Sequence, residues 1–566
     1  MGHIADALTA ANMSRPVASL GREVQSARSA AFRAAVAKGT AEPLIMPYCF
    51  FGTFIIPALY LAIPHTNRPW LYRARFAVAA LIAAFNVRLI AHTSGSNPAI
   101  AYGSGLYGYW GIMNCLAMLV WSNPQFDAAR IVKVKAEDFP GKGAEKGECK
   151  EGQIDQLIGG NQEGNQEPKP NGNGHPKPSL EPSEPAAVKD SSPLSGGVVR
   201  GEEGYIYYWE PYPKNAPFLY RFSWATDLMT TFRGEGWNWA IPTVPHPPRP
   251  KVHGQYERVK LEAIPKTARS GCTRHDTAKA YLYGNLKTFA TTYVLLDAMS
   301  TYMSMDPFFV VGPSTLPPPS LLRPIPLPLL NFGRSVLFLI SVYQVVLLVM
   351  SYLDILQYFI GGYFYPIRRE AWQHPSIFGS FSSIFDRGLA GFWGGWWHQT
   401  FRVPFTAPVA WMVVNGYLSA GSETTKVLGV LSAFLNSGLL HACGSYTTVP
   451  PTKLYRAPLF FTLCALGIFV QQALCRRLTP VLARVPMPLR RSGNFLFVLV
   501  WLWATCWPLA HDFGTAGLWL FEPVPVSIFR GLGLGAEGES WWRWDDYTFT
   551  LYRGKRWWEV GLALGA

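Results

Sequence analysis

Long apolar runs recur along the chain, separated by short polar connections. The clearest cover residues 45–64, 74–93, 103–121, 287–311, 333–362, 404–420, 426–446, 457–475 and 493–511. A helix needs roughly 20 mostly apolar residues to span a bilayer, and several runs reach that length. Trp and Tyr gather at their ends, as they do at membrane interfaces. The pattern predicts an all-α, polytopic transmembrane helical bundle with about eight or nine spans.

One long polar insertion interrupts these runs between residues 122 and 286. Residues 138–200 are rich in Gly, Pro, Glu, Lys, Asn and Ser and nearly free of aromatics. Such a segment cannot bury enough apolar surface to offset its chain entropy, so we expect it to be disordered. Residues 204–241 are dense in aromatic side chains. We expect this second part of the insertion to dock on the membrane domain.

The alternation of apolar and polar stretches divides the chain into six segments. They are a polar N-terminal segment (1–44), N-terminal transmembrane helices (45–121), a disordered polar insertion (122–203), an aromatic-rich extramembrane segment (204–285), a transmembrane core that carries the candidate chemistry (286–511) and a Trp-rich tail (512–566). The positive-inside rule favours a cytosolic insertion, but a simple count of nine spans puts the Arg-rich stretch 476–491 on the opposite side. One span is therefore re-entrant or miscounted, and the orientation stays open.

Composition supports a chain that faces lipid. Charged residues make up 15% of the sequence, against about 25% in a typical soluble domain. The 50 basic and 36 acidic residues give a formal net charge of +14. Because the basic residues lie between apolar runs, they favour anionic lipid or a phosphate-bearing cosubstrate over nucleic acid. The eight Cys residues form no CxxC pair, so the sequence predicts no metal site.

Two histidines stand out against this apolar background. His398 lies in a Gly- and Trp-rich segment, residues 374–402, that is too polar to cross lipid. His441 lies near the end of an apolar helix, residues 430–446, where an ionisable group is costly and is a functional candidate. Taken alone, His398 could be an interfacial anchor and His441 a core histidine bonded to a carbonyl. Their joint occurrence in two recognisable contexts favours a catalytic pair.

The surrounding motifs resemble the fungal wax-synthase-like branch of the membrane-bound O-acyltransferase superfamily. That branch carries PxxFGS, then FWGRRWHQ, then an apolar helix with SGLxH. The matches here are Pro375, Phe378, Gly379, Ser380, Phe392, Trp393, Gly394, Trp397, His398, Gln399, Ser437, Gly438, Leu439 and His441. The insertion is similar too, with a DL…RGxGWNW stretch at Asp227, Leu228, Arg233, Gly234, Gly236, Trp237, Asn238 and Trp239.

This sequence also departs from the branch at three points. Gly395 and Trp396 stand where the branch often has two Arg residues, and Ala442 stands where Glu often follows the second histidine. Many members of the superfamily carry Asn or Asp at the position of His398.

The resemblance implies an acyltransferase that takes its acyl group from coenzyme A. It makes His441 the general base and His398 the residue that orients the thioester or polarises its carbonyl. Trp397, Gln399 and Ser437 would then contact the substrates. Arg387 and Arg402 would meet the coenzyme A phosphates, or else snorkel to the interface.

The same resemblance implies acetyl-CoA as cosubstrate, no permanently bound cofactor and an endoplasmic reticulum membrane. The expected acceptor is a lipophilic alcohol such as a terpenoid or meroterpenoid. The alternative within this class is a wax ester synthase that joins a long acyl chain to a fatty alcohol.

A membrane transporter is the alternative of a different class. Asp297 and Asp354 lie within apolar runs, and acids inside a membrane can mark ion paths. However, the sequence has no evident internal repeat of the kind that many transporters show. The acyltransferase interpretation is therefore favoured.

Overall fold

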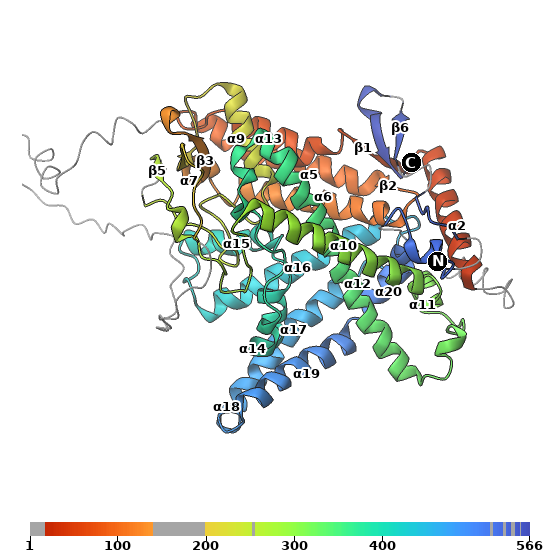
Figure 1. The fold of residues 1–566 in the computed structure, drawn as a ribbon. Coiled ribbons are helices and arrows are strands. Elements are labelled where there is room, and N and C mark those ends of the chain that lie inside the picture. The colour runs from red at the N-terminus through yellow and green to blue at the C-terminus, as the bar shows by residue number, and fades with distance from the viewer. Residues whose placement is uncertain are drawn as a thin grey trace, which may run out of the picture.

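The computed structural model describes residues 17–139, 198–251, 255–520, 524–535, 539–544, 549–554 and 556–565. The segment expected to be disordered, 138–200, falls mostly on residues 140–197, outside the described residues, so its disorder stays a prediction. The described chain is mostly helical (Figure 1). Its long helices are α2 (Val17–Ala37), α5 (Arg75–His92), α6 (Pro98–Leu119), α10 (Ala278–Met303), α12 (Leu327–Leu356), α16 (Glu423–Thr447), α17 (Arg456–Arg477) and α19 (Met487–Thr505).

Fewer helices than expected are long and apolar enough to cross a membrane. Among the described residues these are Pro69–His92, Leu327–Phe364, Glu423–Thr447 and Arg456–Arg477. A fifth is counted if α19 and α20 (Trp507–Ala516), bent by 48°, form one span. These apolar helices indicate a membrane protein, but the expected eight or nine spans are not confirmed.

Two of the predicted runs are cut short for visible reasons. Strand β1 (Glu42–Met46) takes the first residues of the run at 45–64, which leaves the short apolar helix Phe51–Ala62. Helix α15 (Arg402–Val414) stops before Gly416, whose φ of 79° is incompatible with a continuing helix. The run at 404–420 therefore yields a helix too short to span.

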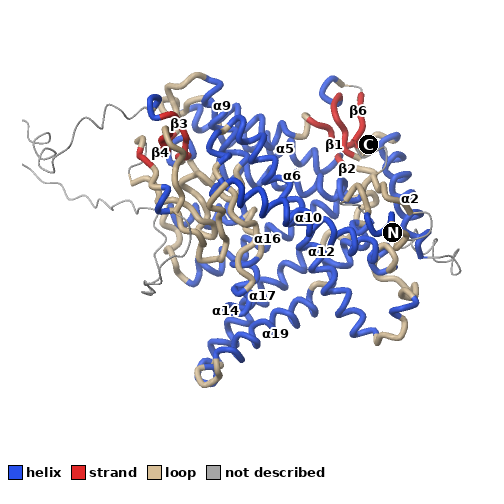
Figure 2. Tube along the Cα trace, in the orientation of Figure 1, coloured by secondary structure: helices blue, strands red, loops and turns tan. Residues whose placement is uncertain are grey.

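Two small sheets flank the helices, so the all-α expectation is corrected (Figure 2). One has the order β2-β1-β7-β6, with β2 at Thr93–Ser94, β6 at Phe549–Arg553 and β7 at Val560–Leu564. It pairs the N-terminal region with the C-terminal tail. The other is antiparallel, with the order β3 (Ala129–Lys135), β4 (Tyr205–Pro211) and β5 (Glu257–Arg258). Their β-branched and aromatic residues favour strands, and β3 and β4 pair the residues that precede and follow the polar segment 138–200.

The aromatic part of the insertion packs on the N-terminal helices. Helix α9 (Phe218–Thr230) lies against α3 (Ile56–Ala62), and the fully buried Trp224 meets Trp237 edge to face at 5.1 Å. A buried charge network ties this layer together. Asp227 accepts hydrogen bonds from Arg130 at 3.4 Å and from Arg368 at 2.8 Å. Such buried charges are tolerated only when they are paired and hydrogen-bonded, so this network specifies where the insertion docks.

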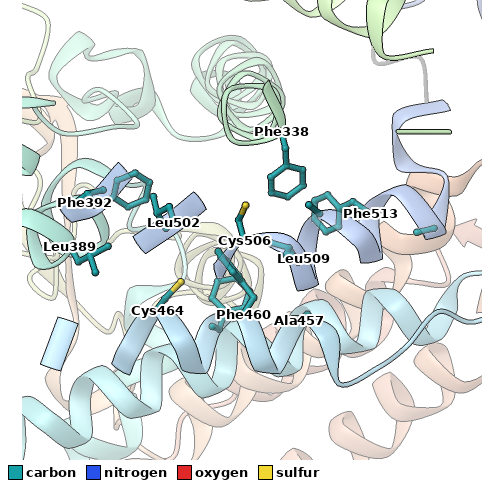
Figure 3. Close-up of a cluster of buried hydrophobic side chains, with 14 of the residues drawn as sticks. Phe338, Leu389, Phe392, Ala457, Phe460, Cys464, Leu502, Cys506, Leu509 and Phe513 are labelled. Carbon is teal, nitrogen blue, oxygen red and sulfur yellow. The ribbon is translucent and has the colours of Figure 1, made fainter. Parts of the chain in front are cut away.

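The main apolar core lies where α12, α17, α19 and α20 meet the segment that begins with α14 (Ser382–Gly391). Figure 3 shows its members from separate elements: Phe338 of α12, Leu389 of α14, Phe460 and Cys464 of α17, Leu502 of α19, and Leu509 and Phe513 of α20. Phe392, directly after α14, belongs to the same cluster. The core therefore fixes the start of the segment that carries His398.

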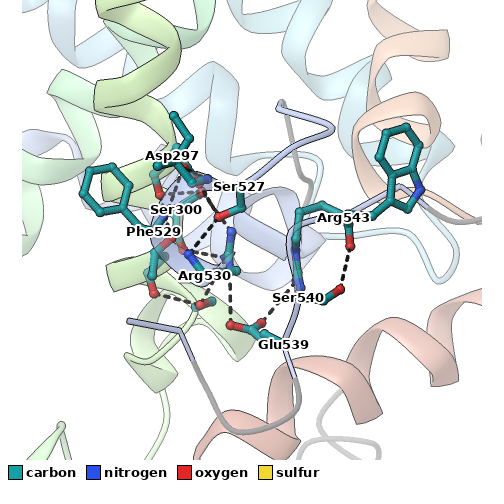
Figure 4. Close-up of polar contacts among 12 residues, drawn as sticks. Asp297, Ser300, Ser527, Phe529, Arg530, Glu539, Ser540 and Arg543 are labelled. Carbon is teal, nitrogen blue, oxygen red and sulfur yellow. Dashed lines mark hydrogen bonds and ion pairs between the residues drawn. The ribbon is translucent and has the colours of Figure 1, made fainter. Parts of the chain in front are cut away.

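The C-terminal tail is anchored on α10 through one buried carboxylate (Figure 4). Asp297 accepts hydrogen bonds from the Ser527 hydroxyl and from the backbone N–H groups of Ile528 at 2.6 Å and Phe529 at 3.2 Å. Arg530 adds a contact with Glu539 at 3.1 Å. Asp297, one of the two acids behind the transporter alternative, thus has a structural role. Two predicted segment boundaries, 285/286 and 511/512, fall inside α10 and α20.

We expect Asp297→Ala to loosen the tail. The change leaves one buried hydroxyl and two backbone N–H groups without their acceptor, and each unsatisfied buried group costs about 1–3 kcal/mol. Limited proteolysis should cut the tail faster and the melting temperature should fall. Glu423→Ala, which removes only exposed ion pairs with Lys426 and Arg476, is the control and should change little. Equal behaviour of the two variants would contradict the assignment.

Candidate active site

A cavity of about 1160 Å³ opens between α12, α15, α16 and α17 and the segment around residues 392–402. Aromatic and aliphatic side chains form most of its lining. Only a few polar side chains reach it, and His398 and His441 are among them. Ligand cavities commonly combine an apolar wall with a few polar groups that fix orientation. The two histidines therefore line the same cavity.

His398 is held in place by an irregular helix. In α14, Gly388 has a φ of 57°, and the helix then widens into the π-turn η8 (Phe392–Trp396). Gln471 of α17 stabilises the break because its Oε1 accepts the Leu389 N–H at 2.8 Å. Its Nε2 donates to Asn494 of α19 at 3.1 Å. Two neighbouring helices thus set the path of the chain toward His398.

The FGS motif, residues 378–380, contacts the π-turn η8 and supports it. The Gly379 N–H donates to the Trp396 carbonyl at 2.9 Å, and a Cβ at Gly379 would lie 2.2 Å from the Gly395 carbonyl oxygen. Only glycine permits this approach. A Cβ at Gly395 would in turn meet the Arg387 guanidinium at 2.3 Å.

Gln399 and Arg402 form a connected pair at the cavity wall. The Gln399 amide group donates to the carbonyls of Trp393 at 2.7 Å and Trp397 at 2.8 Å. Its oxygen accepts a hydrogen bond from Arg402 at 3.1 Å. Gln399 therefore closes the turn that presents His398, and it also orients the Arg402 guanidinium.

The RGxGWNW stretch of the insertion lies behind the His398 segment. Arg233 donates to the carbonyls of Ser376 at 2.9 Å and Pro375 at 3.1 Å. Phe232 packs edge to face against Phe401 at 6.3 Å, and Phe401 in turn contacts the His398 ring at 6.1 Å. The insertion therefore supports the site without lining the cavity.

The His398 ring lies among aromatic side chains, with Trp397 at 5.4 Å and Phe378 at 6.1 Å between ring centroids. Its Nδ1 is buried and has no hydrogen-bond partner in the described structure. Burial lowers the pKa of His398 to about 4, and the charges of His441 and Arg233 act in the same direction. The imidazole is therefore neutral at physiological pH.

His441 has a different environment. It lies on α16, where its ring stacks on Phe461 at 5.2 Å and an interplanar angle of 19°. Its Nδ1 is 3.2 Å from the Tyr102 hydroxyl of α6. The Nε2 has no partner among the described residues. Nδ1 of His441 therefore contacts Tyr102, and Nε2 is available to a group bound in the cavity that His441 lines.

The structure gathers most of the predicted site residues. Those that line the cavity are His398, His441, Trp397, Gln399, Ser437 and Arg402. The Ser437 hydroxyl donates to the Ala433 carbonyl of its own helix at 2.9 Å, which leaves its oxygen able to accept. Arg387 is exposed and does not line the cavity, so its predicted contact with coenzyme A stays a prediction.

Sequence reasoning missed two residues. Tyr102 precedes His441 by 339 positions, so no local spacing could connect them. Gln344 lines the cavity from α12 and is 9% exposed. The available signal for Gln344 was an amide side chain inside a strongly apolar run, 333–362.

We expect Gly379→Ala to destabilise the site. The new methyl group collides with backbone oxygens of Gly395 and Ser270, at 2.2 and 2.5 Å, and overpacking of this kind costs about 1–3 kcal/mol. The matched control is Gly394→Ala, because a Cβ at Gly394 meets nothing within 4 Å. Thermal unfolding of the purified variants should show a lower melting temperature for Gly379→Ala alone. A normal melting temperature for both would contradict the close contact.

Comparisons with known proteins agree with the motifs. A model of the membrane bound O-acyl transferase family matches residues 374–463. Acetyltransferase ple2 of Rhodocybe pseudopiperita is 26% identical over 259 residues, which are 46% of this chain and 57% of the relative. Acetyltransferase pyr8 of Aspergillus fumigatus is 32% identical over 156 residues (26% of this chain, 35% of the relative). O-Mevalon transferase yanI of Aspergillus niger is 25% identical over 238 residues (41% of this chain, 47% of the relative).

These matches span only part of the relatives, 57% of ple2 and less of the other two. No solved structure shows significant similarity to this chain. The matched family segment begins at His374, ends at Leu463 and contains both His398 and His441. The resemblance predicted from the motifs is thereby confirmed: residues 374–463 are similar to the membrane bound O-acyl transferase family.

Proposed function

We propose that this protein transfers an acyl group from a coenzyme A thioester to a hydroxyl group of a lipophilic acceptor, within the endoplasmic reticulum membrane. The observation that carries the proposal is that two imidazoles, His398 and His441, face one apolar cavity. Acyl transfer to an alcohol needs a base for the hydroxyl proton, and a neutral imidazole suits that task. The cavity also keeps out water that would hydrolyse the thioester.

In the proposed reaction, His441 Nε2 accepts the hydroxyl proton while the alcohol oxygen attacks the thioester carbonyl carbon. His398, which is neutral, donates a hydrogen bond from its ring N–H to the carbonyl oxygen as negative charge develops there. The tetrahedral intermediate then collapses, the C–S bond breaks and the thiolate of coenzyme A leaves. The imidazolium of His441 returns its proton to the sulfur. The products are the ester and coenzyme A, and no covalent enzyme intermediate is needed.

Two cations on the cavity wall support binding of the coenzyme A donor. Arg402 lines the cavity near the start of α15, and Lys426 lines it near the start of α16. Arg402 already has a fixed orientation through Gln399. Charge-assisted hydrogen bonds from such groups suit phosphate oxygens. Arg402, which is close to His398 in the chain, therefore supports a coenzyme A phosphate at its end of the cavity.

Acetyl is the proposed acyl group, and an oxygenated terpenoid or meroterpenoid is the proposed acceptor class. Two of the relatives are named acetyltransferases. The volume of about 1160 Å³ slightly exceeds the roughly 300–1,000 Å³ of typical ligand pockets. That space suits a bulky acceptor and a short acyl group better than it suits a small alcohol.

We expect His441→Ala to lower kcat by at least about 10² because it removes the proton acceptor. His398→Asn should retain measurable activity, since an amide can still donate a hydrogen bond to the thioester carbonyl. Both can be measured in microsomes with acetyl-CoA and a panel of hydroxylated terpenoids. If His398→Asn loses all activity while His441→Ala keeps it, the roles of the two residues are the reverse of those proposed. Normal turnover by both variants, in protein shown to be membrane-inserted, would refute the mechanism.

We expect acetyl-CoA to be used in preference to palmitoyl-CoA. The assay compares kcat/KM for the two donors with the same acceptor, with free coenzyme A as the readout. A clear preference for the C16 donor, together with activity on fatty alcohols, would support the wax ester alternative instead.

We expect Arg402→Gln to raise KM for either donor, because it removes a cation proposed to bind coenzyme A. This variant separates loss of donor binding from the choice of acyl chain.

A further inference from the structure

One polar side chain on the cavity wall, Gln344, has a buried atom without a partner and no role in the proposed reaction. It lies near the middle of the apolar segment Leu327–Phe364, reaches the cavity from α12 and is 9% exposed. Its amide oxygen, Oε1, is buried and has no hydrogen-bond partner among the described residues. A polar group inside an apolar span is costly and is a functional candidate. Gln344 is therefore a candidate to bind a group that enters the cavity.

We propose that Gln344 is a specificity-determining residue that hydrogen-bonds a second oxygen of the acceptor. This oxygen belongs to a hydroxyl or carbonyl group remote from the hydroxyl that is acylated. A glutamine amide suits both groups, because its oxygen accepts from a hydroxyl and its nitrogen donates to a carbonyl. The inference rests on the proposed acyl transfer, and it narrows the acceptor to an apolar skeleton that carries at least two oxygen functions.

Two other buried glutamines have both ends of the amide paired within the protein. Gln125 accepts a backbone N–H at 2.8 Å and donates to backbone carbonyls at 2.6 and 2.8 Å. Gln471 accepts a backbone N–H at 2.8 Å and donates to a side-chain amide at 3.1 Å. Gln373 also has an unpaired amide in the described structure, but it does not line the cavity. Gln344 thus combines an unpaired amide oxygen with a place on the cavity wall.

The wall around Gln344 suits a ligand that is mostly hydrocarbon. Among the α12 residues that line the cavity, only Gln344 and Tyr343 carry a polar group, and the others are Phe, Leu, Ile, Val and Met. A carbon skeleton buries its apolar surface against such a wall, and a single amide among apolar side chains fixes its orientation. A plain fatty alcohol chain would leave the amide unpaired, which is unfavourable. The wall therefore favours an oxygenated skeleton over an unsubstituted chain.

The same wall argues against a contact between Gln344 and coenzyme A. The cations that line the cavity, Arg402 and Lys426, lie on α15 and α16. Helix α12 contributes no charged side chain to the cavity. The phosphates of the donor therefore have their partners on other elements, and the amide on α12 is assigned to the acceptor.

Gln344 and the proposed base reach the cavity from different helices. His441 belongs to α16, which packs on α6 and α17, whereas Gln344 belongs to α12, which packs on α10. Tyr343, directly before it, stacks on Trp396 at 5.3 Å, in the turn that leads to His398. An acceptor that bonds Gln344 through one oxygen can therefore present a different oxygen to His441. The contact would then select which hydroxyl is acylated.

The first test is Gln344→Met, which keeps the length of the side chain and removes both polar atoms of the amide. We expect kcat/KM for a sesquiterpene diol to fall about 10-fold, while kcat/KM for the monohydroxylated parent of the same skeleton stays unchanged or rises. KM for acetyl-CoA should not change. The matched control is Gln472→Met, because Gln472 lines the same cavity from α17 but is exposed, so water can satisfy its amide.

Three kinetic results would overturn the proposal. Equal losses with the diol and its parent would reduce Gln344 to a packing role. A higher KM for acetyl-CoA in Gln344→Met would move the contact to the donor. An unchanged preference between the two acceptors would remove Gln344 from acceptor recognition.

The melting temperature separates a role in recognition from a role in the fold. An amide without a partner lowers the stability of the ligand-free protein, so Gln344→Met should keep or raise the melting temperature. A clearly lower melting temperature would show that the amide is bonded within the protein, and it would also overturn the proposal.

A binding measurement distinguishes failure of this inference from failure of the proposed function. A ligand that binds the folded state raises the melting temperature. Without any donor present, the diol should therefore stabilise purified wild-type protein and Gln472→Met more than it stabilises Gln344→Met. If wild-type protein transfers no acyl group but this difference is seen, the proposed function fails and the contact stands. If the enzyme is active and the diol stabilises all three proteins equally, the contact alone is refuted.

Discussion

The close approach of α6 and α16 is the contact on which the site depends. Gly105 faces the backbone of α16 so closely that no side chain fits there. The Thr447 hydroxyl then donates to the Ala101 carbonyl at 2.6 Å, and the Ser94 hydroxyl donates to the Thr447 carbonyl at 2.5 Å. Dispersion and hydrogen bonding both gain from this proximity. Without it, Tyr102 would lie too far from His441 to bond, and α6 would separate from the helix that carries His441.

The apolar lining of the cavity is the second constraint on the site. The cavity is lined mainly by aromatic and aliphatic side chains, so a charge that forms inside it is poorly solvated. That cost favours the neutral form of His398, and a lining of this kind also strengthens the hydrogen bonds made inside the cavity. The larger ion-pair networks lie elsewhere. Arg130, Asp227 and Arg368 are joined where the insertion docks, and Arg530 pairs with Glu539 in the tail.

Local sequence was sufficient for the parts of the site that are local in the chain. The two histidines and their Trp-rich and apolar contexts were recognisable from motifs within residues 374–446, and both residues line one cavity. The expected count of eight or nine spans is not confirmed, because apolar length alone cannot detect a Gly416 that ends a helix or a strand at 42–46 that shortens one. The sheets were missed because their strands pair residues far apart, such as Leu44 with Leu564. Tyr102 was missed for the same reason, since its partner lies in another part of the chain.

The two histidines are supported by different regions of the chain. Behind His398 lies the insertion, through Phe232 and Phe401 at the ring and Arg233 at the preceding loop. Behind His441 lies Tyr102 of α6. The matched family segment, 374–463, contains both rings, but Phe232, Arg233 and Tyr102 all lie outside it. Residues 286–511 therefore contain both imidazoles, whereas several of the side chains that support them lie outside that range.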